Sequence, residues 1–192
     1  MARLRLRSQS HVVERCRILG EELRSALAHL ASDDPAVVDA AWRGEALGTL
    51  LWALQLVELP PYDRPFDPDV VTGADPGEGE LRDADEIALE RESARLWHWR
   101  ARTSDLQAAG ELDLPDRFRS LDQLVAATAM RGHERGLLPA PIRGDFRAFG
   151  KVYRHLSEDQ QAEALSIAVE RHHALNWLAG EGTSWDDVPL DT

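Results

Sequence analysis

Apolar side chains recur at three- and four-residue spacing along most of the chain, which is the pattern of amphipathic helices. Neither a convincing hairpin signal nor a βαβ alternation interrupts this pattern. It predicts an all-α fold: a single globular helical domain of about five or six helices, with a Pro/Gly-rich extended segment and an irregular acidic C-terminal tail. Within residues 1–192 we expect N-terminal helices over 10–58, a connection over 59–80, a helical body over 81–180 and a tail over 181–192.

The first helix is predicted from Ser10 to Ala31, and Asp33-Asp34-Pro35 reads as a stop followed by a new start. Proline suits the first position of a helix, where its missing N–H costs nothing. The second helix should then run to Glu58. From Ala46 onward it is apolar nearly all round, which is typical of a central, buried helix.

The stretch from Leu59 to Glu80 holds half of the ten prolines and three glycines. Because proline removes backbone donors and glycine raises chain entropy, we expect an extended surface segment here. Connections of this length are uncommon in compact domains, and they are often functional or disordered.

A third helix is predicted over Asp83–Ala109, with acids leading and arginines closing it, as the helix dipole favours. Ser120 with Gln123 forms a capping box that opens a fourth helix, and a second capping box at Ser157 opens a last helix that stops at Gly180. Between them, four residues at helical spacing predict a short helix: Phe146, Phe149, Tyr153 and Leu156.

The net charge of −12 changes the picture of possible partners. Nucleic acids and anionic membranes attract basic proteins, so we expect neither as a partner. Another protein with a basic surface fits better, and the sequence sets no oligomeric state. Residues 1–31 carry a local excess of arginine, which we expect to lie on the acidic body.

Cys16 is the only cysteine, so no internal disulfide framework or multi-cysteine zinc site is expected. Its place in an amphipathic pattern favours a small buried side chain over a reactive thiol. The start of the chain lacks the apolar core of a signal peptide, and no apolar run is long enough to span a bilayer. These features predict a cytoplasmic protein. Lys151 is the only lysine, which suggests a GC-rich bacterial genome.

Common catalytic signatures, such as Gly-rich phosphate loops and nucleophile elbows, are absent, and we expect no cofactor. Glu170 and His173 have the Glu-x-x-His spacing of di-iron bundles, but this is one copy where two are needed, so no metal is predicted. His172 falls in line with apolar positions and is interpreted as a satisfied core histidine. Glu45 opens the most apolar helix and needs a partner, either Arg171 or His173.

Other side chains keep two readings. Asp186 and Asp187 are expected to pair with arginines, although a shared site with Glu45 remains the alternative. In Trp97-His98-Trp99, core packing is favoured for both tryptophans, and the alternative for Trp99 is a partner-facing aromatic.

Three stretches resemble the bacterial domain of unknown function 4272 family: Trp42 through Leu59-Pro60-Pro61, the helix around Trp97, and Glu170 through Trp185 to the end. The resemblance implies a bacterial soluble protein and no established reaction. Where the family often has a cysteine after the prolines, this chain has Phe66, so thiol chemistry there does not apply. The candidate cluster is Trp42, Arg43, Glu45, Trp52, Glu170, Arg171, His172, His173, Asn176, Trp177, Trp185, Asp186, Asp187 and Asp191.

Two functions follow from these patterns. The preferred hypothesis is a protein-interaction or binding module, regulatory or immunity-type, that uses an acidic surface. The alternative is a small-molecule or metal-dependent enzyme, which would need His and carboxylate groups within hydrogen-bond reach around a pocket. Its residues would be Glu45, His172, His173, Asn176, Asp186 and Asp187.

Overall fold

The computed structural model describes residues 4–29 and 35–192, and it confirms the all-α fold class. Within these ranges the chain forms six α-helices, two 3-10 helices and one very short hairpin. The helices are α1 (Gln9–Leu27), α2 (Pro35–Ala53), α3 (Pro68–Gly73), α4 (Ala84–Ala109), α5 (Leu121–Glu134) and α6 (Glu158–Leu178). The 3-10 helices cover Pro76–Glu78 and Tyr153–His155, and the strands are β1 (Arg147–Ala148) and β2 (Lys151–Val152).

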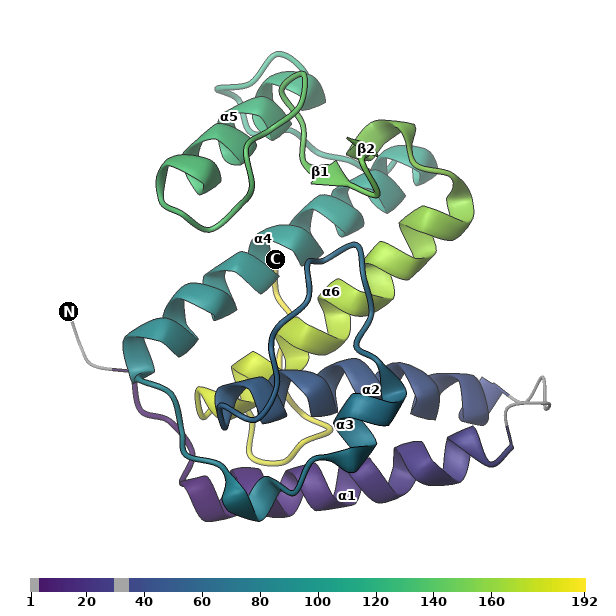
Figure 1. Cartoon of the computed structure of the whole chain (residues 1–192). Coiled ribbons are helices and arrows are strands. Elements are labelled where there is room, and N and C mark those ends of the chain that lie inside the picture. The colour runs from purple at the N-terminus through teal and green to yellow at the C-terminus, as the bar shows by residue number, and fades with distance from the viewer. Residues whose placement is uncertain (1–3, 30–34) are drawn as a thin grey trace.

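The core lies where α2 packs against α1 on one side and α6 on the other, while α6 also packs along α4. Figure 1 shows α1 and α2 together at one end of the molecule, and α5 with the hairpin at the opposite end. Leu50, Leu51 and Ala53 are fully buried, so the second helix is central as predicted. In the part of the chain that the structure describes, no helix is long and apolar enough to cross a membrane.

The helix starts agree well with the sequence pattern. Asp83 and Ser120 are N-caps whose side chains accept a backbone N–H, and Ser157 forms the full capping box with Gln160. The predicted box at Ser120 is only half formed, because the Gln123 side chain accepts the N–H of Arg119 instead. Pro35 opens α2 as expected, while residues 33 and 34 lie outside the described ranges.

The predicted ends of the first two helices are wrong. α1 stops at Leu27, short of Ala31, a residue outside the described ranges. α2 stops at Ala53 rather than Glu58 because Gln55 adopts a left-handed conformation with φ of 61°. The N–H groups of Gln55 and Leu56 then turn back to carbonyls of the last helical turn, which is a Schellman ending.

The connection over 59–80 is only partly extended, which corrects the expectation of a non-helical segment. It contains α3 and the 3-10 helix at Pro76–Glu78. Each starts at an Asp-Pro pair: the side chain of Asp67 accepts the N–H of Asp69, and that of Asp75 accepts the N–H of Gly77. An aspartate cap followed by proline at the first position favours helical turns even in a proline-rich stretch.

The short helix predicted around residues 146–156 is also wrong. The chain instead forms the antiparallel β1–β2 hairpin, in which Arg147 pairs with Val152, followed by a 3-10 helix. Phe149 and Gly150 both have positive φ, at 50° and 68°, which is the type I′ turn that suits a tight hairpin. The apolar spacing is therefore real, but it arises from a turn and not from a helix.

Candidate functional site

A cleft of about 560 Å³, here called the proline-loop cleft, opens between the proline-rich connection and α4. Residues 59–64 form one wall, and residues 137–139 together with β1 form the other. Clefts that combine apolar walls with a few polar groups are the usual binding sites of proteins. The lining side chains are Leu59, Pro60, Pro61, Tyr62, Asp63, Arg64, Glu90, Ser93, Trp97, Leu137, Pro139 and Arg147.

A buried ion pair holds the first wall in place. Arg171 of α6 is 0% exposed, and its Nε donates to Oε2 of Glu45 on α2 at 2.9 Å. Its two other nitrogens donate to the carbonyls of Pro60 at 2.6 Å and of Arg64 at 2.9 Å. The second carboxylate oxygen of Glu45 accepts the N–H of Phe66 at 2.6 Å. The expected ion pair with Arg171 is thus confirmed, and it fixes the loop to two helices.

Two aromatic rings contact the same guanidinium. Its carbon lies 4.8 Å from the ring centre of Tyr62 and 5.0 Å from that of Phe66. Tyr62 in turn stacks on Trp97, a core residue as predicted, with ring centres 5.4 Å apart. Phe66 packs so closely on Gly48 that a Cβ there would come within 2.4 Å of the ring. Phe66 therefore serves packing in this chain.

The cleft contains one carboxyl group with an unusual environment. The hydroxyl of Tyr62 donates to Oε1 of Glu90 at 2.7 Å. Burial raises the pKa of Glu90 and raises that of Tyr62 well above its usual range, so the phenol stays a donor. A perturbed carboxyl in a cleft marks a candidate functional group. A cation placed beside Glu90 would favour its ionised form and would itself be bound by it.

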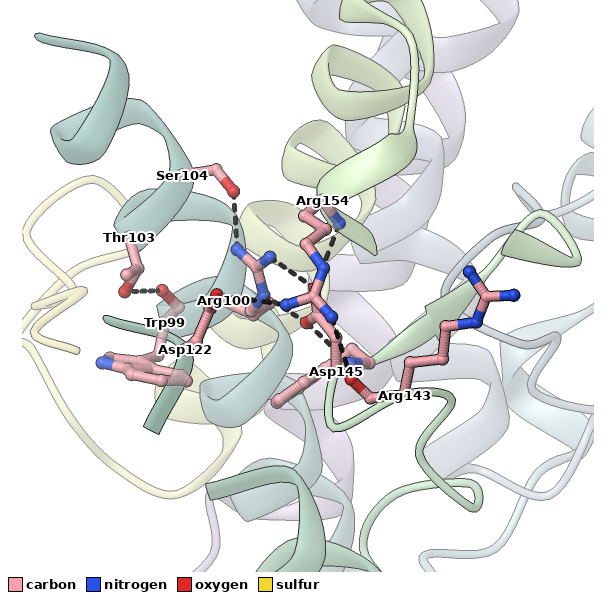
Figure 2. Close-up of polar contacts among 9 residues, drawn as sticks. Trp99, Arg100, Thr103, Ser104, Asp122, Arg143, Asp145 and Arg154 are labelled. Carbon is pink, nitrogen blue, oxygen red and sulfur yellow. Dashed lines mark hydrogen bonds and ion pairs between the residues drawn. The ribbon is translucent and has the colours of Figure 1, made fainter. Parts of the chain in front are cut away.

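A second buried ion pair anchors the opposite wall (Figure 2). Arg100 of α4 donates to both carboxylate oxygens of Asp145, at 2.8 and 2.9 Å, and Asp145 is 0% exposed. Asp145 also accepts the backbone N–H groups of Phe146 and Arg154, while Arg100 donates to the hydroxyl of Ser104. This network fixes the turn before β1 and the 3-10 helix after β2 onto α4.

The two walls are joined directly at the hairpin. The N–H of Phe149 donates to Oδ2 of Asp63 at 2.6 Å, which ties the hairpin turn to the proline loop. Arg64 and Arg147 stand on the cleft as exposed side chains. Both walls are therefore held by buried or half-buried bonds, while the basic groups at the rim stay accessible.

His172 belongs to a buried network of hydrogen bonds. His172 Nε2 lies 3.1 Å from Nδ2 of Asn176, and its Nδ1 lies 3.0 Å from Nδ1 of His98. Arg91 donates to the amide oxygen of Asn176, whose nitrogen also donates to the carbonyl of Pro189. Burial lowers the pKa of His172 to about 3, so the ring is neutral at physiological pH. The interpretation of His172 as a satisfied core histidine is confirmed.

The other face of α6 packs against the tail and the N-terminal region. The rings of His173 and Trp177 lie 4.5 and 5.4 Å from that of Trp185. The guanidinium of Arg15 covers Trp185 at 4.9 Å, and Arg7 donates to the carbonyl of Trp177 at 2.7 Å. Basic residues near the start of the chain thus lie on the body, as expected, and these tryptophans are packing residues.

In the described part of the chain, Asp186 and Asp187 of the tail make no ion pair with an arginine, contrary to expectation. Asp187 accepts from the N–H and hydroxyl groups of Thr183 and Ser184, and these bonds lower its pKa to about 2. Asp186 and Asp191 are exposed, and among the described residues neither lies within ion-pair distance of an arginine. Local turn bonds satisfy Asp187 before a distant arginine can.

Three of the candidate residues meet at a second cleft of about 430 Å³ between α2 and α6. Trp42, Arg43 and Glu170 line it together with Asp39. Burial raises the pKa of Glu170 to about 7, with Arg43 opposing the shift and the nearby carboxylates adding to it. Glu170 therefore titrates close to neutral pH.

Trp52 lines neither cleft and fixes the far end of the proline-rich connection. Arg82 stacks over its ring at 4.9 Å and donates to its carbonyl at 2.8 Å. The N–H groups of Glu80 and Arg82 bond the carbonyls of Leu54 and Ala53. The proline-rich connection is therefore bonded to the end of α2 just before α4 begins.

Four residues of the proline-loop cleft were not singled out from the sequence. Tyr62 and Glu90 line the cleft, and Arg100 and Asp145 form the ion pair that supports one of its walls. Tyr62 stands among prolines, which is a weak aromatic signal. Glu90, Arg100 and Asp145 look like ordinary charges of helix faces and turns. Their pairing depends on long-range packing, so only the structure reveals it.

Within residues 4–29 and 35–192, no three His, Cys, Asp or Glu side chains are grouped so that they could hold a metal ion. Comparison with protein-family models, with curated proteins and with solved structures returned no match. The geometry of the two clefts is therefore the basis for the functional conclusion.

Proposed function

We propose that the protein is a binding module, in a regulatory or immunity-type role, that holds a basic segment of a partner polypeptide in the proline-loop cleft. The observation that carries this proposal is the half-buried carboxyl of Glu90, whose pKa is raised by burial inside a cleft with fixed walls. A cationic side chain would relieve the cost of ionising Glu90 there. The two buried ion pairs keep the cleft formed before the partner arrives, which lowers the cost of binding.

The segment that supplies one wall of the cleft is acidic. Residues 58–92 hold twelve acidic side chains against three arginines, so this stretch carries a large part of the net charge of −12. It includes the proline loop, the caps of α3 and α4 and the first turns of α4. Such a field attracts a basic partner to this part of the molecule and speeds its association at low salt.

The rim favours a polypeptide over a simple cation. Arg64 and Arg147 would repel a small cation, but they can donate to the backbone carbonyls of a peptide whose basic side chain meets Glu90. The prolines and the ring of Trp97 offer apolar contact for the rest of the segment. We therefore expect a partner segment with basic and apolar residues together.

A display selection of random peptides on the immobilised full-length protein tests this proposal. Peptides that combine Lys or Arg with apolar residues should be enriched, because they match both the carboxyl and the apolar walls. The enrichment should disappear with Glu90→Gln and persist with Glu134→Gln, an exposed glutamate at the end of α5 that does not line the cleft. Selection of acidic peptides, or equal selection by both variants, would contradict the proposal.

The resemblance to the bacterial domain of unknown function 4272 family suggests a further proposal about the proline loop. Glu45 and Arg171 belong to the stretches that carry the resemblance, and they are the residues that fix the proline loop. We propose that members with the same pair hold an equivalent loop. An experimental structure of one such member, with the loop placed elsewhere, would count against this.

A second candidate function, an acid–base enzyme, is favoured by one observation. Glu170, with a pKa raised to about 7, lines the cleft with Arg43 and Trp42. A carboxyl that titrates near neutral pH is suited to general acid–base catalysis. A carbon-detected NMR titration of Glu170 tests this, and an ordinary glutamate pKa would remove the candidate.

A further inference from the structure

A cavity of about 300 Å³, here called the arginine cavity, lies between α4 and α5. Its α4 residues are on the opposite face of that helix from those of the proline-loop cleft, so the two sites are separate. Gly132 forms part of the lining, and a Cβ there would meet Leu138 at 2.5 Å. The lining residues are Glu92, Arg95, Leu96, Trp99, Arg117, Leu124, Thr128, Arg131, Gly132 and Arg135.

The lining of this cavity holds four arginines and one carboxylate, that of Glu92. Arg95 makes two bonds to Glu92, at 3.0 and 2.8 Å, and Arg135 lies 3.5 Å from the same group. In the described part of the chain, neither Arg117 nor Arg131 has a carboxylate within ion-pair distance. The lining therefore carries a formal charge of +3 (four arginines against one glutamate) in a protein whose net charge is −12.

The donors at the cavity remain available for a ligand. Arg131 uses its Nε for the carbonyl of Ala127 at 3.1 Å, which orients the side chain and leaves its two terminal nitrogens without a partner among the described residues. Arg117 is exposed, and its guanidinium lies 5.1 Å from the ring centre of Phe118. Guanidinium groups present pairs of parallel N–H donors, which match the oxygens of a phosphate group.

One wall of the cavity is aromatic. Trp99 is partly buried against the core and lines the cavity beside the apolar side chains of Leu96 and Leu124. An indole ring offers a flat apolar face on which another aromatic group can stack. The lining thus combines a group for anion recognition with a surface for a planar apolar body.

We propose that the arginine cavity binds a small organic phosphate, in which a phosphate group is carried on a flat aromatic body. The phosphate meets the guanidinium groups of Arg117, Arg131 and Arg135, and the aromatic body lies on Trp99. This site is independent of the partner-binding cleft, because it uses other residues and the opposite sign of charge.

Isothermal titration calorimetry of the full-length protein in phosphate-free buffer tests this proposal with phenyl phosphate and inorganic phosphate as probes. Phenyl phosphate should bind once per chain and more tightly than inorganic phosphate. The pair Arg117→Gln and Arg131→Gln should weaken both by about a hundredfold, because each lost charged bond is worth at least about 1.4 kcal/mol, a factor of ten. A matched control, Arg24→Gln with Arg102→Gln, removes the same charge at exposed arginines that do not line this cavity.

The variant Trp99→Leu isolates the aromatic contribution. It should abolish the preference for phenyl phosphate and leave the affinity for inorganic phosphate unchanged. Absence of saturable binding, or equal weakening by the control pair, would overturn the phosphate site. Equal affinity of the wild type for the two probes would overturn the assignment of an aromatic body.

Discussion

All three guanidinium nitrogens of the buried Arg171 donate hydrogen bonds. It donates hydrogen bonds to Glu45 and to the carbonyls of Pro60 and Arg64, and two aromatic rings lie against its guanidinium. A buried guanidinium without such partners would be very unfavourable. The need of Glu45 for a cation was predictable from its place in an apolar helix. The bonds of Arg171 to two loop carbonyls were not predictable, because every residue has a backbone carbonyl and the sequence does not indicate which ones face Arg171.

Replacement of Arg171 by methionine should destabilise the protein by about 3–5 kcal/mol, because Glu45 is left buried without its cation. Urea unfolding of the purified variant measures this loss. The control is Arg17→Met, which removes a partner of Glu14 at an exposed pair and should cost under about 1 kcal/mol. A similar small loss for both variants would show that the buried pair does not hold the fold.

Tyr153 carries a buried hydroxyl that has no hydrogen-bond partner among the described residues. Its ring lies under Arg100, with the guanidinium 4.4 Å from the ring centre. A buried unsatisfied polar group costs stability, so Tyr153→Phe should raise the free energy of unfolding by about 1 kcal/mol. Thermal and urea unfolding check this, and a clear loss of stability would mean that the hydroxyl has a partner.

Glu170 should make stability depend on pH. Its pKa is raised to about 7 in the folded state from 4.5, so folding favours the protonated form. The contribution of Glu170 to the free energy of unfolding is most favourable below its pKa in the unfolded chain, and it is lost as the pH rises through its pKa in the folded protein. Glu170→Gln should therefore be more stable than the wild type at about pH 8, by up to about 3 kcal/mol, and nearly equal at about pH 4.

Urea unfolding of Glu170→Gln and of the wild type at both pH values measures this difference. Glu134→Gln serves as the control, because this exposed glutamate lines neither cleft and should show no such trend. A difference between Glu170→Gln and the wild type that does not change with pH would contradict the raised pKa.

At the scale of elements, the long helices were predictable because their caps and periodicity agree. The hairpin was not, since its type I′ turn uses Phe149 before Gly150, where Asn-Gly would have been the usual signal. The bond from the N–H of Phe149 to Asp63 helps to offset the cost of this conformation. Similarly, Gln55 ends α2 in a conformation that sequence patterns assign to glycine.

The end of α6 offers a test at this scale. Gly180 has φ of 84°, and a Cβ there would lie 3.3 Å from the carbonyl oxygen of Arg5. Gly180→Ala should therefore cost about 1–2 kcal/mol, the price of a left-handed residue with a side chain. Gly73→Ala is the matched control, because its Cβ would meet nothing within 4 Å, and it should cause no loss. Chemical denaturation compares the two, and equal effects would contradict the assigned ending.

At the scale of the whole molecule, the sequence predicted the fold class, the acidic character and the central helix, but not the clefts. The proline-loop cleft joins residues 59–64, α4, residues 137–139 and β1, which meet only after the chain has folded. Of the candidate motif residues, Glu45 and Arg171 hold a wall of this cleft, while most of the others line the second cleft or pack in and against the C-terminal region. The sequence could thus identify Glu45 and Arg171, which support the cleft. The exposed groups that line the cleft belong to no recognisable motif and could not be identified in this way.

The central claim is that a partner polypeptide binds at the proline-loop cleft, and site-specific photo-crosslinking in the native host tests it most directly. A photoreactive benzoylphenylalanine is placed at Arg147, an exposed residue of the cleft, and in a parallel strain at Arg102, an exposed residue that does not line it. The account predicts one crosslinked protein from position 147 alone, attached through a segment rich in Lys or Arg. The same crosslinks from both positions, none from position 147, or attachment through an acidic segment would contradict it.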